Sequence, residues 1–188
     1  ISVVVKDFAK PSYSGSLDLE KFNLNQLLDS LNIAVAARKN KPLLNNFAIS
    51  SNGFSGDMQN ISLKGLQISA GDSLKASFGT LRVQNFSNPS VSGDVSLPTF
   101  NLNQTLDGLG IAVAERKNKP LLNSFAFSGG FNATPTAANL SNVKISAGGL
   151  VNATLGKLAV QNFSKPSVNG DINLPTFNLN QTLDGLGI

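Results

Sequence analysis

The stretch LPTFNLNQTLDGLGI, residues 97–111, recurs letter for letter as residues 174–188, a shift of 77 residues. A more divergent copy, LDLEKFNLNQLLDSLNI at residues 17–33, lies 78 residues before the first of these two. Long repeats at a fixed period are typical of proteins in which each unit is one structural element packed on its neighbours. The sequence therefore predicts a tandem-repeat protein with a unit of 77–78 residues.

This period divides the chain into about two and a third units. Residues 1–33 are the C-terminal part of one unit, and residues 34–111 and 112–188 are two full units. Both ends cut through a unit, so we expect one continuous segment of a longer protein rather than separate compact domains.

The quoted stretch predicts a short helix of about ten residues. Leucines recur at i, i+4 and i+7 from Leu102, which places them on one helix face. Asn101 and Gln104 have the spacing of a capping box at the start. Gly110, which is Asn32 in the first copy, favours a left-handed residue just after the end.

The rest of each unit predicts four strands, or about ten in the whole chain. Apolar and polar residues alternate from Val91 to Leu97, and similar runs precede them. The alternation slips by one residue at Gly65 and at the matching Asn142, which indicates a β-bulge or a bend. We expect a mainly β fold with short helices: an elongated, curved antiparallel sheet, roughly 50 Å long at ~4.8 Å per strand.

Composition excludes several classes of protein. The chain has no Cys and no His, so it holds no zinc finger, disulfide scaffold, thiol protease or Ser-His-Asp triad. Only 14% of its residues are charged, and the net charge of +4 comes from scattered basic residues, which argues against nucleic acid. No apolar run approaches the ~20 residues that span a bilayer. Because no catalytic or metal-ligating groups recur together, we expect no enzyme, no cofactor and no metal site.

One helix per unit is too short to cover four strands. The apolar face of the sheet therefore needs a second sheet, another chain or an apolar ligand to cover it.

The order of the motifs in a unit resembles the repeats of the AsmA-like family, which includes AsmA and the TamB- and YhdP-type proteins. The likeness covers nearly the whole chain. It rests on the run from Phe22 to Ile33, the pair Leu44 and Phe47, the series Leu63, Leu66 and Ile68, the strand Leu74 to Val83, and Asn85-Phe86 before Pro89.

This resemblance implies a bridge-like lipid transfer protein with a long β-groove, apolar inside. Its partners would be phospholipid acyl chains, conducted between the inner and outer membranes. The protein would be periplasmic and anchored in the inner membrane through a segment not present here, with neighbouring copies or repeats at the cut ends. Two features depart from the family: the near-identity of the copies, and Arg38-Lys39-Asn40-Lys41 where the family is often more acidic.

The resemblance also assigns the lining of the groove to apolar strand residues. The alternative interpretation is that these residues are the ordinary core of the sheet. The expected lining residues are Phe47, Ile49, Leu63, Leu66, Ile68, Leu74, Phe78, Leu81, Phe125, Phe127, Leu140, Val143, Ile145, Val151, Leu155 and Leu158. We interpret Arg38-Lys39-Asn40-Lys41 and Arg116-Lys117-Asn118-Lys119 as solvated loops, the alternative being contact with anionic headgroups.

A second hypothesis comes from a different class of protein. Stacked β units, rich in Ser, Asn and Gly and free of Cys and His, also suit a bacterial surface fibre or adhesin whose apolar faces bury one another.

Overall fold

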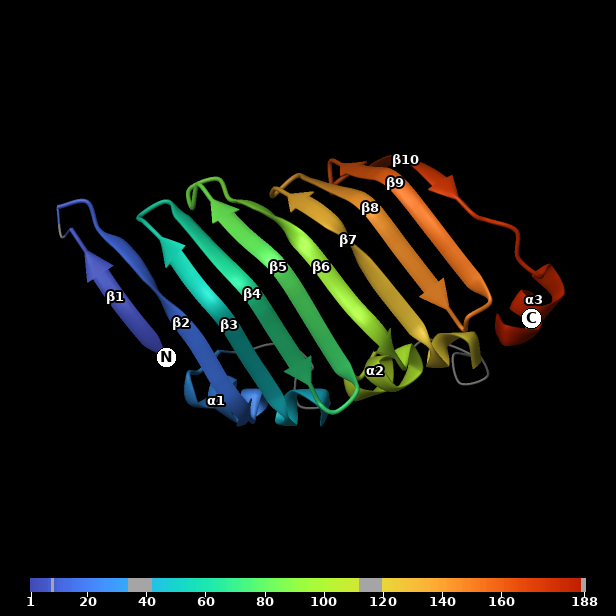
Figure 1. The fold of residues 1–188 in the computed structure, drawn as a ribbon, viewed down its shortest axis with the longest axis horizontal. Helices are drawn as coiled ribbons and strands as arrows, with labels where there is room; N and C mark the ends of the chain where they lie inside the picture. The colour runs from blue at the N-terminus through green and yellow to red at the C-terminus, as the bar shows by residue number, and fades with distance from the viewer. Residues whose placement is uncertain (8, 34–41, 112–119, 187–188) are drawn as a thin grey trace.

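The computed structural model describes residues 1–7, 9–33, 42–111 and 120–186 and shows one open antiparallel sheet of ten strands in sequence order (Figure 1). In the described ranges, three short helices and two 3-10 turns accompany the sheet. The elements are β1 (Ser2–Lys6), β2 (Ser12–Phe22), α1 (Leu24–Ser30), η2 (Pro42–Asn45), β3 (Phe47–Gly56), β4 (Asn60–Ala70), β5 (Leu74–Gln84), β6 (Ser90–Phe100), α2 (Leu102–Gly108), η4 (Pro120–Asn123), β7 (Phe125–Ala133), β8 (Ala137–Ala147), β9 (Val151–Gln161), β10 (Ser167–Asn173) and α3 (Leu179–Leu186). The predicted fold class is confirmed.

The capping residues of α1 and α2 lie where the sequence predicts, although each helix has seven residues instead of about ten. The side chain of Asn101 accepts a hydrogen bond from the backbone N–H of Gln104 at 2.9 Å, which caps the start of α2. Gly110 follows the helix with a φ of 69°, and Asn32 follows α1 with a φ of 54°. The N–H of Ile111 then donates to the carbonyl of Leu106 at 2.9 Å. Of the two hydrogen bonds that define a Schellman cap, this is the one that spans more residues.

The predicted slips in alternation are left-handed residues inside strands. Gly65 of β4 has a φ of 57° and Asn142 of β8 a φ of 50°, a region that glycine and asparagine enter more readily than other residues. The pairing of β4 with β3 and β5 keeps its register past Gly65. The strand is therefore bent without gaining a residue relative to these neighbours.

The regular strand β2 shows which way the bent strands face. Residues directly opposite one another in antiparallel strands lie on the same face of the sheet. Gly15 and Leu19, four residues apart in β2, share a face, and through β3 they line up with Leu63 and Ile68 of β4. The slip at Gly65 therefore keeps the apolar residues of both halves of β4 on one face.

Helices and 3-10 turns form a row along one end of the strands, which we call the helix rim (Figure 1). Each 3-10 turn contacts the helix before it and the helix after it. Leu43 of η2 is buried, and a Cβ added at Gly71 or Gly108 would lie within 2.7 Å of its side chain. Leu43 therefore joins the turn after β4 to α2, the helix at the end of the same unit. The strand hairpins at the opposite end form what we call the hairpin rim.

Gly65→Val is expected to lower the free energy of unfolding by about 1–3 kcal/mol, because valine is strained at positive φ. An added Cβ would also lie 2.4 Å from the side-chain nitrogen of Asn52. The control is Gly79→Val in β5, where a Cβ meets nothing within 4 Å. Urea unfolding of both variants checks this, and equal stability for the two would contradict a left-handed bend at Gly65.

Candidate functional site

One face of the sheet carries most of the large apolar side chains of its strands, and we call it the apolar face. In the helix-rim half, Leu66 of β4 pairs with Phe78 of β5, and Phe78 pairs with Val95 of β6. In the hairpin-rim half, Leu140 of β8 lies between Phe131 of β7 and Leu158 of β9. Because directly paired residues share a face, these rows run across the sheet from strand to strand.

All sixteen residues that the sequence singles out as groove lining lie on the apolar face. The pairing ladders place them there together: Phe47, Ile49, Leu63, Leu66, Ile68, Leu74, Phe78, Leu81, Phe125, Phe127, Leu140, Val143, Ile145, Val151, Leu155 and Leu158. The structure thus brings these side chains onto one surface, whatever that surface binds.

The list from sequence leaves out further residues of the same face. Most come from β6, whose alternation was recognised but not assigned to a face, and from β2, whose alternation was not noted. The full set, with residues of neighbouring strands, is Tyr13, Leu17, Leu19, Phe54, Ile61, Val83, Val91, Val95, Leu97, Phe131 and Val160. The regular period of β2 and β6 is the signal that would have added their residues.

Side chains on the apolar face are crowded although the sheet is a single layer. Val143 is only 2% exposed, and Leu66 and Leu155 are also buried. Phe78 and Phe131 meet edge to face across β6 with ring centroids 6.5 Å apart. Apolar neighbours on adjacent strands therefore shield one another and give the face a continuous hydrocarbon surface.

Ser51 is buried on the apolar face, and its hydroxyl group hydrogen-bonds to backbone carbonyls of the protein. The hydroxyl oxygen of Ser51 lies 2.9 Å from the carbonyl oxygen of Lys64 and 3.0 Å from that of Gly53. These carbonyls flank the bend in β4 and the irregular pairing of β3. A hydroxyl bonded in this way costs little to bury, so it leaves the surface effectively apolar.

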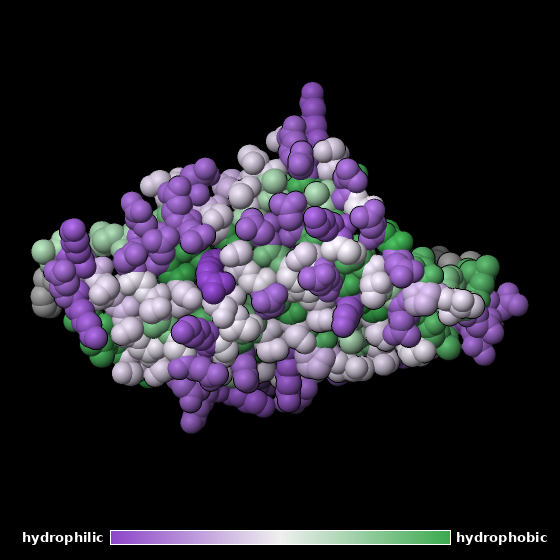
Figure 2. Space-filling view, turned by 45° about the horizontal axis from the view of Figure 1, so that its top comes forward, coloured by the Kyte–Doolittle hydropathy of each residue, from purple (hydrophilic) through white to green (hydrophobic). Residues whose placement is uncertain are grey.

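The opposite face is polar and mixes short side chains with long charged ones. Its members include Asp18, Ser50, Gln67 and Ser77, which pair in one row from β2 to β5. A shallow hollow of about 660 Å³ lies over this row and reaches Lys75. Most of the surface in view in Figure 2 is white or purple, with green between these side chains and at both ends. The two faces of the sheet thus differ sharply in chemistry.

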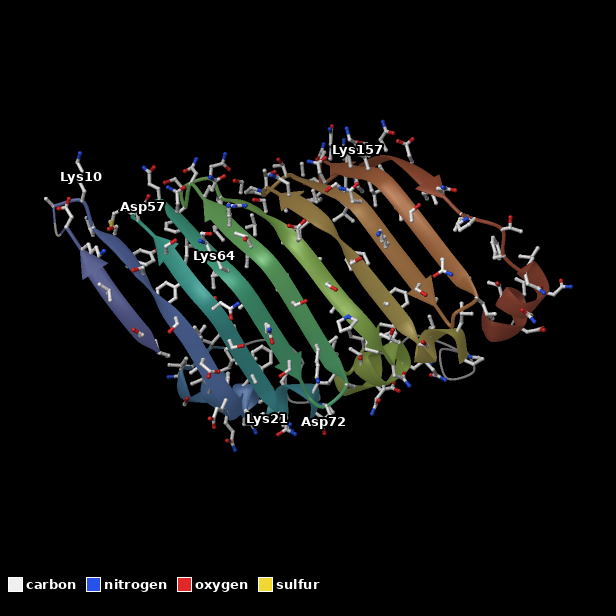
Figure 3. The ribbon with its side chains drawn as sticks, viewed as in Figure 1. Lys10, Lys21, Asp57, Lys64, Asp72 and Lys157 are labelled. Carbon is white, nitrogen blue, oxygen red and sulfur yellow. The ribbon has the colours of Figure 1, made fainter. Side chains whose placement is uncertain are left out.

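Charged side chains lie at both rims (Figure 3). At the helix rim, Lys21 and Asp72 form an exposed ion pair at 3.1 Å. At the hairpin rim, the backbone N–H of Gln59 and the side chain of Asn60 donate to the Asp57 carboxylate and hold its pKa below the ordinary value. These are ordinary turn contacts and supply no reactive group.

Within the described ranges, no three or more Asp and Glu side chains gather as a metal site would require. No helix in this part of the chain is long and apolar enough to cross a membrane. The two basic segments, Arg38-Lys39-Asn40-Lys41 and Arg116-Lys117-Asn118-Lys119, lie outside the described residues, so their expected roles stay predictions. They hold six of the chain's 15 basic residues.

No protein-family model, no curated protein and no solved structure matches this chain. What the chain does must therefore be inferred from the two faces of its sheet.

Proposed function

We propose that this chain is a segment of a bridge-like lipid transfer protein of the AsmA-like kind. It holds phospholipid acyl chains on the apolar face and conducts them between the inner and outer membranes. The observation that carries the proposal is the apolar face itself, which continues across the sheet. In the part of the chain that the structure describes, the helices lie at the strand ends and not over this face (Figure 1).

The size of the face suits an acyl chain. Strands of eleven residues such as β4 and β5 span about 36 Å at ~3.3 Å per residue. The hydrocarbon core of a bilayer is about 30 Å thick, so the tails of one leaflet reach about 15 Å. Each CH₂ group removed from water contributes about 0.8 kcal/mol, so one long tail gains roughly 10 kcal/mol or more. The face is therefore wide enough for tails and apolar enough to hold them.

Repetition of the lining favours movement along the sheet. Leu66, Ile68 and Phe78 of one unit correspond to Val143, Ile145 and Leu155 of the next. These are apolar side chains of similar size, so a tail meets no unit that binds it much more tightly than its neighbour. Headgroups stay in water while tails slide, and transport needs no catalytic group.

The proposed setting follows from the same resemblance. The segment lies in the periplasm, and its anchor in the inner membrane and its contacts with both membranes belong to parts outside this chain. No cofactor, metal or nucleic acid has a role in this function, and the chain does not act as an enzyme.

The direct test is the lipid content of the chain purified without strong detergent. Organic extraction followed by mass spectrometry is expected to recover phospholipid in at least stoichiometric amount. A lipid-free, monodisperse and stable protein would contradict the proposal and favour the surface fibre or adhesin, in which apolar faces cover one another.

A further inference from the structure

The outer edge of β10 is a second surface with a defined chemistry. Among the described residues, β10 pairs only with β9. Its counterpart β6 has a related sequence, SVSGDVS at residues 90–96 against SVNGDIN at residues 167–173, with the same alternation of apolar and polar residues. Unlike β10, β6 pairs on both sides, with β5 and with β7. Comparing β6 with β10 therefore shows the same strand edge once with a partner strand, in β6, and once without one, in β10.

The exposure of corresponding residues differs between the strand with a partner and the strand without one. Val168 and Ile172 of β10 are 66% and 67% exposed, whereas their counterparts in β6, Val91 and Val95, are half-buried. Phe177 is 37% exposed, but its counterpart Phe100 is 8% exposed. The end of the sheet formed by β10 and the residues that follow it up to Phe177 thus leaves apolar side chains open, whereas the corresponding residues beside β7 are more buried.

An aromatic contact repeats at each junction where the edge is occupied. Phe100 packs edge to face on Phe125 of β7 with ring centroids 5.8 Å apart, and Phe22 packs on Phe47 of β3 at 5.7 Å. Phe177 is the third member of this series in the sequence. A partner strand at β10 therefore needs a phenylalanine at its first position.

An amide contact repeats beside the aromatic one. The side-chain N–H of Asn25 in α1 donates to the side-chain oxygen of Asn45 in η2 at 2.9 Å. Asn103 in α2 donates in the same way to Asn123 in η4 at 3.0 Å. The corresponding residue of α3 is Asn180. At each occupied junction, the helix asparagine thus binds the last residue of a Pro-Leu-Leu-Asn turn. That residue lies two positions before the phenylalanine.

We infer that the edge formed by β10 and α3 binds a β-strand from another repeat of this kind. That strand begins with phenylalanine, alternates apolar and small residues, and follows a Pro-Leu-Leu-Asn turn, as β7 does after η4. The binding mode is addition of a strand to an open sheet edge, with backbone hydrogen bonds giving affinity and the turn and phenylalanine giving specificity. This inference concerns a peptide partner and is independent of the proposed lipid function.

The test titrates the whole chain with a synthetic peptide of residues 120–133, capped at both ends. Saturable binding is expected, together with slower hydrogen exchange at the backbone amides of β10. The same peptide with Phe125→Ser is expected to bind about tenfold more weakly, because it loses the aromatic pair and its buried area. A peptide of residues 137–147, the β8 sequence, is the control strand and is expected not to bind.

Three results would overturn the inference. These are no binding by the 120–133 peptide, equal binding by the β8 peptide, and protection that appears at β1 instead of β10. Phospholipid content is measured on the same samples, so that failure of peptide binding can be told apart from failure of lipid binding. The two can fail separately because the peptide binds at the edge of β10, at the end of the sheet, and not over the apolar face.

Discussion

Leu43→Ala is expected to lower the free energy of unfolding by about 2–5 kcal/mol, the range for a buried leucine truncated to alanine. Leu43 is 6% exposed and lies against Gly71 and Gly108, where an added Cβ would come within 2.7 Å of it. Truncation leaves a cavity between the β4–β5 turn and α2, inside the helix rim of the unit 34–111. Urea unfolding followed by circular dichroism measures the loss.

The matched control is Leu150→Ala in the turn between β8 and β9. Leu150 is 37% exposed, so we expect a change of no more than about 1 kcal/mol. If Leu43→Ala were as mild as Leu150→Ala, Leu43 would not pack the strand turn against α2 as the structure indicates.

Phe78→Asp and Leu155→Asp are each expected to lower the amount of bound phospholipid per chain at least about tenfold relative to the unchanged chain. Both residues lie on the apolar face, paired with Leu66 and Val143. A carboxylate there would have to lose its water for a tail to pass over it, which costs several kcal/mol. Extraction and quantification of phospholipid from each purified variant measures the effect.

The neighbouring residues on the opposite face provide matched controls. Ser77→Asp and Thr154→Asp add the same charge one residue away on the polar face, and lipid content is expected to stay unchanged. Circular dichroism and gel filtration confirm that all four variants fold. Equal lipid loss from both faces, or no loss from either, would contradict binding at the apolar face.

Much of the fold can be predicted from the sequence, because the decisive signals are local. Asn101 and Gly110 mark the two ends of α2 by their capping chemistry alone. The slips at Gly65 and Asn142 identify the left-handed bends, and period-two alternation identifies the strands. Each of these depends on residues within a few positions of one another.

Features that depend on neighbouring strands could not be predicted in the same way. The 3-10 turns at Pro42–Asn45 and Pro120–Asn123 are only four residues long, too short to show a period, and their leucines are buried by elements far away in the sequence. The face of each half-strand beyond a slip became clear only from the pairing with β2 and β6. The sequence therefore predicted a one-sided sheet without saying which β2 and β6 residues complete its apolar side.

The measurement that tests the central claim most directly is photo-crosslinking from single positions on the two faces. A benzophenone side chain replaces Phe78 or Leu140 on the apolar face, and Ser77 or Asn139 on the polar face. After irradiation in cells that make the protein, mass spectrometry of the purified chain detects attached phospholipid. The account predicts lipid adducts from Phe78 and Leu140 and none above background from Ser77 and Asn139. Adducts from both faces alike, or from neither, would contradict it.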